Sequence, residues 1–151
     1  MELLRFACVG DYEAINRIAS QVCALHASWG SGIAVEYPYP MDYYTELIQE
    51  KKLLVAESNG EVVSYLYFYF WTAGGPAAAR RKMVSIDDIG VEESLRNRGI
   101  GQKMMDEFRE YASREGCDAV NLYVDAPNQN AIAFYEKCGF TIRNHGMTMK
   151  L

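Results

Sequence analysis

Apolar residues recur along this chain with two kinds of spacing, one of which predicts helices and the other strands. Over residues 15–25 they return every three or four positions, which places them on one face of a helix. The same spacing predicts a second helix over residues 100–116. Residues 42–50 and 128–138 predict two shorter helices, and Gly139 is suited to the position just beyond the end of the last one.

Short apolar runs, some of them alternating with polar residues, predict strands around these helices. The predicted strands are residues 2–7, 52–58, 61–72, 83–91, 118–124, 140–144 and 147–151. Asn59-Gly60 separates the second strand from the third and is a strong hairpin-turn signal. Gly74-Gly75-Pro76 lies in the connection that follows the third strand.

This order of elements predicts a mixed α/β (α+β) fold. The hairpins require antiparallel neighbours, so an all-parallel, doubly wound sheet is excluded. We expect a central, mixed and mostly antiparallel sheet of six to seven strands, flanked by about four helices. A chain of 151 residues suits a single domain spanning residues 1–151, with a sizeable core.

Composition and charge exclude several classes of protein. A formal net charge of −5 argues against a nucleic-acid partner, which normally meets a basic face. The longest apolar run, residues 65–71, is far shorter than the ~18 residues of a membrane span. The first five residues lack the layout of a signal peptide, so we expect a cytoplasmic protein with no membrane partner. Four scattered cysteines and two histidines argue against a metal site or a disulfide framework.

Residues 96–101 read Arg-Asn-Arg-Gly-Ile-Gly and lead from a strand into the long helix. Glycine lets the main chain pass close to a bulky anion, and a helix N-terminus offers unpaired N–H groups to it. The segment predicts a pyrophosphate-binding turn; the alternative is an ordinary tight connection. It is not a dinucleotide-binding motif, because Met104 stands where a third glycine is required, and Gln102 after Gly101 excludes a P-loop.

A second segment, residues 128–140, reads Asn-Gln-Asn-Ala-Ile-Ala-Phe-Tyr-Glu-Lys-Cys-Gly-Phe. Together, Arg96-x-x-Gly99-x-Gly101 and Asn128-x-x-Ala131-x-x-Phe134-Tyr135-x-x-x-Gly139-Phe140 resemble the GNAT superfamily of acyl-CoA N-acyltransferases. The resemblance is close over residues 83–145 and loose over the whole chain. It implies a GNAT-like fold, in agreement with the pattern above, and acetyl-CoA as the co-substrate, with no metal.

The resemblance also implies which residues hold the coenzyme. The backbone amides that would face its pyrophosphate are those of Arg98, Gly99, Ile100, Gly101 and Gln102. The side chains of Arg96, Arg98 and Lys103 would either add charged contacts or form an ordinary solvated turn.

The resemblance places the pantetheine arm along a strand edge. In this chain that edge is Ile89, Gly90 and Val91, with Gly90 relaxing the strand locally. The N–H near Ile89 would then stabilise the oxyanion of the reacting thioester. A plain strand interior is the alternative.

Two residues of the second segment have predicted roles. Tyr135 stands where the family's motif places a tyrosine beside the coenzyme A sulfur, which makes it the predicted general acid. From its spacing alone, a packed core aromatic is the favoured interpretation, and the resemblance reverses that preference. Asn128 would bond the pantetheine, cap the following helix, or do both. Nothing pairs Cys138 with a histidine, so direct attack by the amine is expected in place of a covalent acyl-enzyme.

A base is needed because an alkyl amine of pKa ~10 is neutral only about one part in a thousand at pH 7. Asp87 and Asp88 precede the turn, and some family members that acetylate polyamines or sugar amines carry an acidic pair there. Adjacent residues of a strand point to opposite faces. We therefore expect only one of them to face the acceptor: Asp87 as the base, with Asp88 serving the loop or the surface.

The acceptor pocket is expected to be aromatic. Its predicted residues, besides Asp87, are Trp29, Glu36, Tyr37, Tyr67 and Tyr69, with Tyr39, Tyr43 and Trp71 close to them in sequence. Aromatic faces beside a carboxylate suit an ammonium group. The alternative is a buried strand and a packed lid.

The leading hypothesis is an acetyl-CoA-dependent N-acetyltransferase. Its acceptor would be a small primary amine, such as a polyamine, an amino acid or an amino sugar. The alternatives are a protein N-terminal or lysine acetyltransferase, a non-catalytic coenzyme A sensor, and an interaction module that uses residues 73–82. The resemblance also suggests a homodimer.

Overall fold

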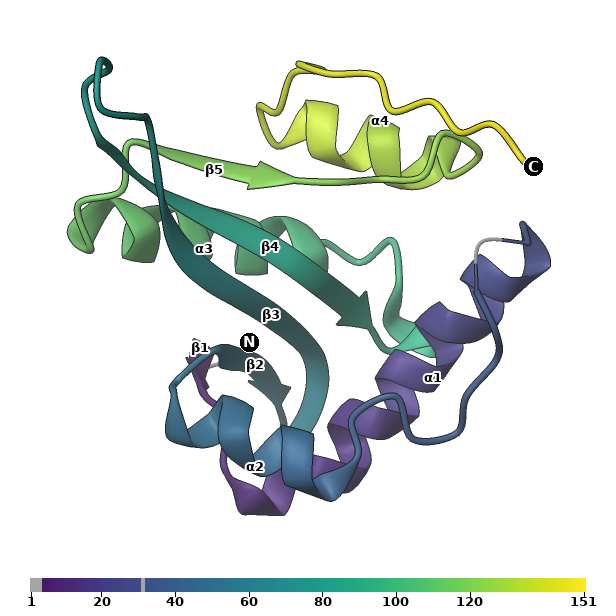
Figure 1. The fold of residues 1–151 in the computed structure, drawn as a ribbon. Coiled ribbons are helices and arrows are strands. Elements are labelled where there is room, and N and C mark those ends of the chain that lie inside the picture. The colour runs from purple at the N-terminus through teal and green to yellow at the C-terminus, as the bar shows by residue number, and fades with distance from the viewer. Residues whose placement is uncertain (1–3, 31) are drawn as a thin grey trace.

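A five-stranded sheet forms the centre of the computed structural model, which describes residues 4–30 and 32–151 (Figure 1). Its strands follow one another in sequence order across the sheet: β1 (Leu4–Phe6), β2 (Leu53–Ser58), β3 (Glu61–Ala73), β4 (Arg81–Val91) and β5 (Ala119–Leu122). The first four are antiparallel neighbours, and β5 joins β4 in parallel. The mixed, mostly antiparallel sheet is therefore confirmed.

Four helices lie on this sheet, and two short 3₁₀ turns precede α1 and α3. The helices are α1 (Tyr12–Ser28), α2 (Met41–Gln49), α3 (Ile100–Arg114) and α4 (Gln129–Lys137); the turns are η1 (Val9–Asp11) and η2 (Glu93–Leu95). All four predicted helices are confirmed, within a few residues of the predicted ends.

The alternation of β2 and β3 divides the core between the two faces of the sheet. Val55 and Tyr65 pack with Ile15 and Ile18 of α1 and with residues of α2. Their neighbours Leu54, Leu66 and Phe68 pack on the other face with Met104 and Phe108 of α3, and Phe134 and Tyr135 of α4 lie against this second cluster. The two faces therefore separate α1 and α2 from α3 and α4.

Three turns form where the sequence predicts them. Asn59 and Gly60 both have positive φ (51° and 80°), as a tight two-residue hairpin turn requires. Gly116 and Gly139 take φ of 75° and 96° just beyond α3 and α4. The last turn is closed by the N–H of Phe140, which donates to the carbonyl of Tyr135 at 3.0 Å.

The end of the chain differs from the prediction. No strand forms over residues 140–144 or 147–151, so the sheet of the described residues has five strands in place of six to seven. Residues 141–151 are all exposed and form no hydrogen bond with the described remainder of the chain. The physical reason is that a strand needs a neighbour for its main-chain groups, and this segment does not meet the sheet edge.

Two smaller differences concern strand ends. The strand predicted over residues 118–124 is Ala119–Leu122. The strand predicted over residues 2–7 is Leu4–Phe6, and its first two predicted residues lie outside the described part of the chain.

A β-bulge interrupts β4 in front of the predicted coenzyme turn. Tyr67 pairs with Asp88 and Phe68 pairs with Ile86, so Asp87 has no partner on β3. A bulge of this kind changes which face the following residues occupy. Ile86 and Ile89 accordingly both lie against the α3 cluster, although three positions separate them, whereas Gly90 contacts Tyr65 and Ile18 on the opposite face.

Candidate active site

The predicted pyrophosphate turn leads into α3 through Gly99, whose φ of 83° places it in the left-handed region. The first backbone hydrogen bond of the helix runs from Lys103 N–H to Gly99 O at 3.0 Å. Within the described residues, the N–H groups of residues 98–102 have no acceptor. Five main-chain donors thus remain for an anion at the positive end of the helix dipole.

Gly101 connects this turn to the second motif. A Cβ at Gly101 would lie 3.3 Å from the ring of Phe134 and 3.6 Å from a methyl group of Val91. Since nine in ten real Cβ contacts are longer than 3.4 Å, a side chain here would press on α4. The glycine therefore lets the first turn of α3 and the helix that carries Tyr135 approach each other closely.

The cationic and polar side chains of the turn take different positions. Arg96 donates through Nε to the carbonyl of Val91 at 3.1 Å, which ties the turn to the end of β4. Arg98 is exposed. Gln102 accepts a long bond from Cys138 Sγ at 3.4 Å and so contacts the end of α4.

The predicted pantetheine edge is open in this structure. β5 pairs with β4 only from Met83 to Ile86, so no strand of the described chain pairs with residues 87–91 on that side. On the other side Ile89, Gly90 and Val91 pair with Leu66, Tyr65 and Ser64 of β3. The two parallel strands therefore separate where a peptide-like arm is predicted to lie.

Asp88 is held by two tyrosines from different elements. Tyr65 Oη donates to Asp88 Oδ2 at 2.6 Å, and Tyr39 Oη donates to the same oxygen at 2.8 Å. Burial raises the pKa of Asp88 above its ordinary value, against the lowering effect of the two hydroxyl donors. Of the two expectations for Asp88, the contact with the loop is borne out through Tyr39, which precedes α2, whereas a surface position is wrong because the bulge at Asp87 turns Asp88 towards the tyrosines on the α1 face.

Asp87 belongs to the same neighbourhood, although its side chain is more exposed. Burial raises its pKa, and its charge contributes to the raised pKa values of Asp88, Tyr39 and Tyr67. Both carboxylates thus act on the same group of tyrosines. That only one of them faces the acceptor stays a prediction; the strict alternation behind it does not hold here, because position 87 is bulged.

Tyr135 lies on α4 between the rings of Phe134 and Phe140, at centroid distances of 5.3 and 5.7 Å. Burial raises the pKa of Tyr135 to about 12, and the negative charge of Asp88 acts in the same direction. The phenol is therefore protonated throughout the neutral range. Its predicted role as the general acid stays a prediction.

Asn128 performs one of its two predicted tasks in this structure. Its side-chain oxygen accepts a hydrogen bond from Ala131 N–H at 3.1 Å, as an N-cap residue does. The cap orients the first turn of α4, the helix that carries Tyr135. A contact of Asn128 with pantetheine stays a prediction.

The aromatic residues predicted for the acceptor pocket divide into two groups. Tyr39, Tyr43, Tyr67 and Tyr69 form a continuous cluster, with neighbouring ring centroids 6.0 to 6.5 Å apart. Tyr37 instead stacks on Tyr12 and donates to Glu13 at 3.2 Å.

Trp29 and Glu36 lie outside the tyrosine cluster. Trp29 ends α1 with its ring 5.6 Å from that of His26, and Glu36 is exposed. The structure thus brings Tyr67 and Tyr69 together beside the acids, and it does not bring Trp29, Glu36 or Tyr37 into that cluster.

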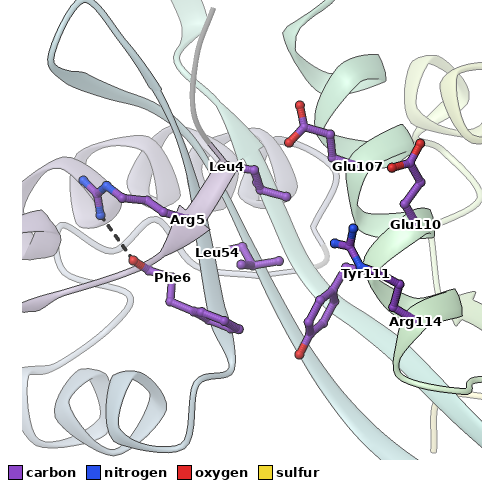
Figure 2. Close-up of a pocket in the computed structure, with 8 residues that line it drawn as sticks. All are labelled: Leu4, Arg5, Phe6, Leu54, Glu107, Glu110, Tyr111 and Arg114. Atoms are coloured by element: carbon purple, nitrogen blue, oxygen red, sulfur yellow. Dashed lines mark hydrogen bonds between the residues drawn. The ribbon is translucent and has the colours of Figure 1, made fainter.

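A cavity of about 490 Å³ lies between β1, β2 and α3, and Figure 2 draws the residues that line it. Its lining includes Arg5, Glu107, Tyr111 and Arg114 and none of the predicted site residues. This cavity is therefore separate from the predicted site residues. No group of three or more metal-ligating side chains occurs in residues 4–30 and 32–151, and no helix within these ranges is long and apolar enough to cross a membrane.

Comparison with known proteins identifies the family. The sequence model of the acetyltransferase (GNAT) family matches residues 21–140, which include the turn at residues 96–101, α4 and both acids. The chain belongs to this family. The match covers both motifs on which the resemblance was stated.

Three relatives of this GNAT chain are informative. An uncharacterized N-acetyltransferase, MJ1207 of Methanocaldococcus jannaschii, is 33% identical over 60% of the chain and 39% of its own length. N-alpha-acetyltransferase 60 of Xenopus tropicalis is 25% identical over 91% of the chain and 59% of its own length. A crystal structure of a mutant of the BH1408 protein from Bacillus halodurans is 26% identical, covers 99% of both chains and has a TM-score of 0.91. The chain thus spans about 40–60% of the length of the curated relatives it matches.

One residue of this GNAT site was missed by the sequence analysis. Tyr65 was treated only as part of an apolar strand, yet it holds Asp88 most closely. The signal that could have found it is the combination of an aromatic residue, Tyr65, with a glycine, Gly90, on adjacent predicted strands. The pairing register that places them opposite each other could not be read from the chain.

Proposed function

We propose that this protein transfers the acetyl group of acetyl-CoA to a small primary amine, by direct attack in a ternary complex. The observation that carries the proposal is the run of five unpaired N–H groups at the start of α3, packed through Gly101 against the helix of Tyr135. The coenzyme's pyrophosphate would take these donors. Its pantetheine arm would pair with the open edge at residues 89–91.

The acid pair would receive the amine's proton. The sequence analysis preferred Asp87 as the base; the deeper burial of Asp88, which raises its pKa despite the two tyrosine donors, favours Asp88, with Asp87 attracting the ammonium at the more exposed position. A carboxylate whose pKa is raised by burial accepts a proton more readily than an ordinary one. Without a base, the scarcity of neutral amine costs about 4 kcal/mol at pH 7.

The chemical step follows from these placements. The neutral amine nitrogen attacks the thioester carbonyl carbon, and the N–H near Ile89 stabilises the oxygen on which negative charge develops. The carbon–sulfur bond then breaks, and the departing thiolate takes the hydroxyl proton of Tyr135, which its pKa of about 12 keeps in place until that moment. The nitrogen loses its extra proton to water as the amide forms, and water returns a proton to the Tyr135 oxygen.

The tyrosine cluster supports a small cationic acceptor. Tyr43, Tyr67 and Tyr69 are at least partly exposed and lie in one cluster with the buried Tyr39, close to two carboxylates. Aromatic faces beside carboxylates attract an ammonium group. The acceptor classes that share this chemistry are polyamines, amino acids and amino sugars.

A protein or peptide N-terminus is the second candidate. It is favoured by the similarity to N-alpha-acetyltransferase 60, which covers 91% of this chain. An α-amino group has a reference pKa near 8, so it needs less help from a base than an alkyl amine does. A peptide would therefore depend less on Asp88 than a polyamine would.

A screen of acetyl-CoA with amines tests the proposal. Purified protein is mixed with acetyl-CoA and, in turn, a polyamine, amino acids, amino sugars and short peptides, and both the melting temperature and thiol release are followed. We expect acetyl-CoA to raise the melting temperature and one amine class to release thiol. Stabilisation without release for any amine would favour a coenzyme A sensor. The absence of both effects would exclude the proposed function.

Two parts of the proposal concern the protein's setting. A cytoplasmic location stays a prediction from the sequence. A homodimer likewise stays an expectation from the resemblance.

A further inference from the structure

β3 continues well beyond the strand that pairs with it on the side opposite β4. β2 pairs with β3 only from Leu53, opposite Tyr67, to Ser58, opposite Glu61. Residues 69–73 of β3 pair with β4 alone, so within the described chain their other edge has no neighbouring strand. In Figure 1 the far ends of β3 and β4 extend past β1 and β2 as a two-stranded ribbon.

The main-chain groups on this free edge belong to Phe70 and Thr72. Phe68 donates its N–H to Lys52 O at 3.0 Å, towards the β2 side of β3. Because main-chain groups alternate in direction along a strand, the N–H and C=O groups of Phe70 and Thr72 face the same way as those of Phe68. Among the residues that the structure describes, no strand pairs with them. Open edges of this kind recruit extended segments of other chains.

A cavity of about 500 Å³ lies at this edge. Its lining is aromatic and cationic and includes no carboxylate: Phe70, Trp71, Thr72, Arg80, Arg81 and Lys82. Phe70 is 38% exposed and Trp71 is 40% exposed, and as adjacent strand residues they point to opposite faces. The indole of Trp71 is held in place, because its Nε1 donates to Ser85 Oγ at 2.8 Å.

Two of the three cations in this lining are unpaired. Lys82 Nζ donates to Glu115 O at 2.7 Å and lies 4.7 Å from the centroid of the Phe70 ring. Arg80 and Arg81 are exposed, and neither forms an ion pair or a side-chain hydrogen bond with another described residue. Their guanidinium groups therefore remain for an anionic ligand.

Arg81 has room to reach the free edge across β3. It pairs with Ala73, so its side chain lies on the same face of the ribbon as that of Trp71. Neighbouring strands are about 4.8 Å apart, and only the methyl group of Ala73 lies between Arg81 and the edge. The cation and the unpaired main-chain groups thus serve one extended binding surface.

We propose that an extended acidic segment of a partner protein binds at this edge. The segment pairs with the main chain of Phe70 and Thr72 as an added strand, and its carboxylates accept hydrogen bonds from Arg80 and Arg81. This edge gives a structural form to the interaction module that the sequence analysis left open for residues 73–82. The inference rests on the hairpin alone and does not depend on the proposed function.

Other anionic occupants fit this edge less well. A nucleic acid offers phosphates to the arginines but no peptide groups to the unpaired N–H and C=O groups of β3. The formal net charge of −5 opposes a large anionic surface such as a nucleic acid or a membrane, whereas a short acidic segment meets mainly charges within the ~8 Å Debye length. A second copy paired through the same edge would bring the same cations into one interface.

Binding of a short synthetic peptide tests the inference on the full-length protein. The probe is a peptide of alternating glutamate and valine, acetylated at its N-terminus so that it cannot serve as an acceptor. We expect saturable binding that weakens as salt rises, with slower amide exchange at Phe70 and Thr72 when the peptide is bound. Arg81→Glu should raise the dissociation constant more than about tenfold, because it replaces an attraction by a repulsion.

Arg143→Glu is the matched control, because it changes the net charge equally but lies outside the cavity. It should raise the dissociation constant less than about twofold, since screening weakens distant charges. Equal weakening by the two variants would mean that the peptide responds only to overall charge and would overturn the inference. No peptide binding at low salt, or binding that leaves the Phe70 and Thr72 amides unprotected, would overturn it too. So would tighter binding of a single-stranded oligonucleotide or of anionic vesicles, or protection of both amides in a dimer of the free protein.

Discussion

Tyr65 and Asp88 are joined by a hydrogen bond of 2.6 Å between two neighbouring strands. Gly90, the residue paired with Tyr65, makes this contact sterically feasible, since a Cβ there would lie 2.6 Å from the tyrosine ring and 2.9 Å from Ile18. The glycine was expected to relax the strand; its packing reason is that the ring of Tyr65 fills the space a side chain would take. The position of the Asp88 carboxylate therefore depends on glycine at position 90, because a larger residue there would displace Tyr65.

Gly90→Ala is the first prediction. The added methyl group must displace Tyr65, so we expect a loss of about 1–3 kcal/mol in the free energy of unfolding and lower activity. Denaturant unfolding measures the loss. Gly75→Ala is the matched control, because a Cβ at Gly75 meets nothing within 4 Å, and it should stay within about 0.5 kcal/mol of the natural protein. Equal stability of the two variants would show that Tyr65 moves without cost.

Asp88→Asn should separate stability from activity. Burial raises the pKa of Asp88, so its ionised form is less favourable in the folded than in the unfolded chain. That cost is absent below the unfolded pKa and grows as pH rises through the raised folded pKa. At pH 7 the neutral amide should therefore keep or raise the melting temperature, while turnover falls about 100-fold or more.

Asp87→Asn is the comparison for this variant. It should weaken binding of a cationic amine, seen as a higher KM, with a smaller effect on kcat. If Asp87→Asn abolishes turnover and Asp88→Asn does not, Asp87 is the base and Asp88 is structural.

Tyr135→Phe tests the general acid. Removing one hydroxyl should lower kcat about 100-fold and leave the affinity for coenzyme A nearly unchanged, because the pyrophosphate donors lie on α3. Single-turnover kinetics and coenzyme A titration measure the two quantities. Loss of both in equal measure would make Tyr135 a packing residue.

The pH dependence of kcat/KM forms the fourth prediction. Activity should rise as pH passes through the raised pKa of the acid pair, since the base must be ionised. Tyr135 must stay protonated, and with a pKa of about 12 it should cause no loss of activity up to about pH 10. An alkaline loss with a midpoint near 8.5 would instead implicate a cysteine.

The helices, the Asn59-Gly60 hairpin and the glycine beyond α4 were predictable because local chemistry determines each of them. Helical periodicity and positive-φ preferences operate within a few residues, whatever the rest of the chain does. The turn at residues 96–101 belongs to the same class, since its glycine and the helix start are adjacent in sequence.

The acids and the C-terminal segment could not be placed in this way. The bulge at Asp87 arises from the register between β3 and β4, and that register reversed the faces assumed for a regular strand. The one sequence signal for a special role of Asp87 and Asp88 was their residue type, because aspartate is depleted in strands. Residues 147–151 alternate between apolar and polar positions as a strand does. The alternation alone does not show whether the edge of a sheet lies within reach to pair with them.

Amide resonances of the protein, recorded by NMR while coenzyme A is added, test the central claim most directly. The account predicts that the amides of residues 98–102 shift most, because their N–H groups gain the pyrophosphate as acceptor, and that residues 89–91 shift with them. Saturating coenzyme A that leaves residues 98–102 unmoved, while amides elsewhere respond or none do, would contradict it.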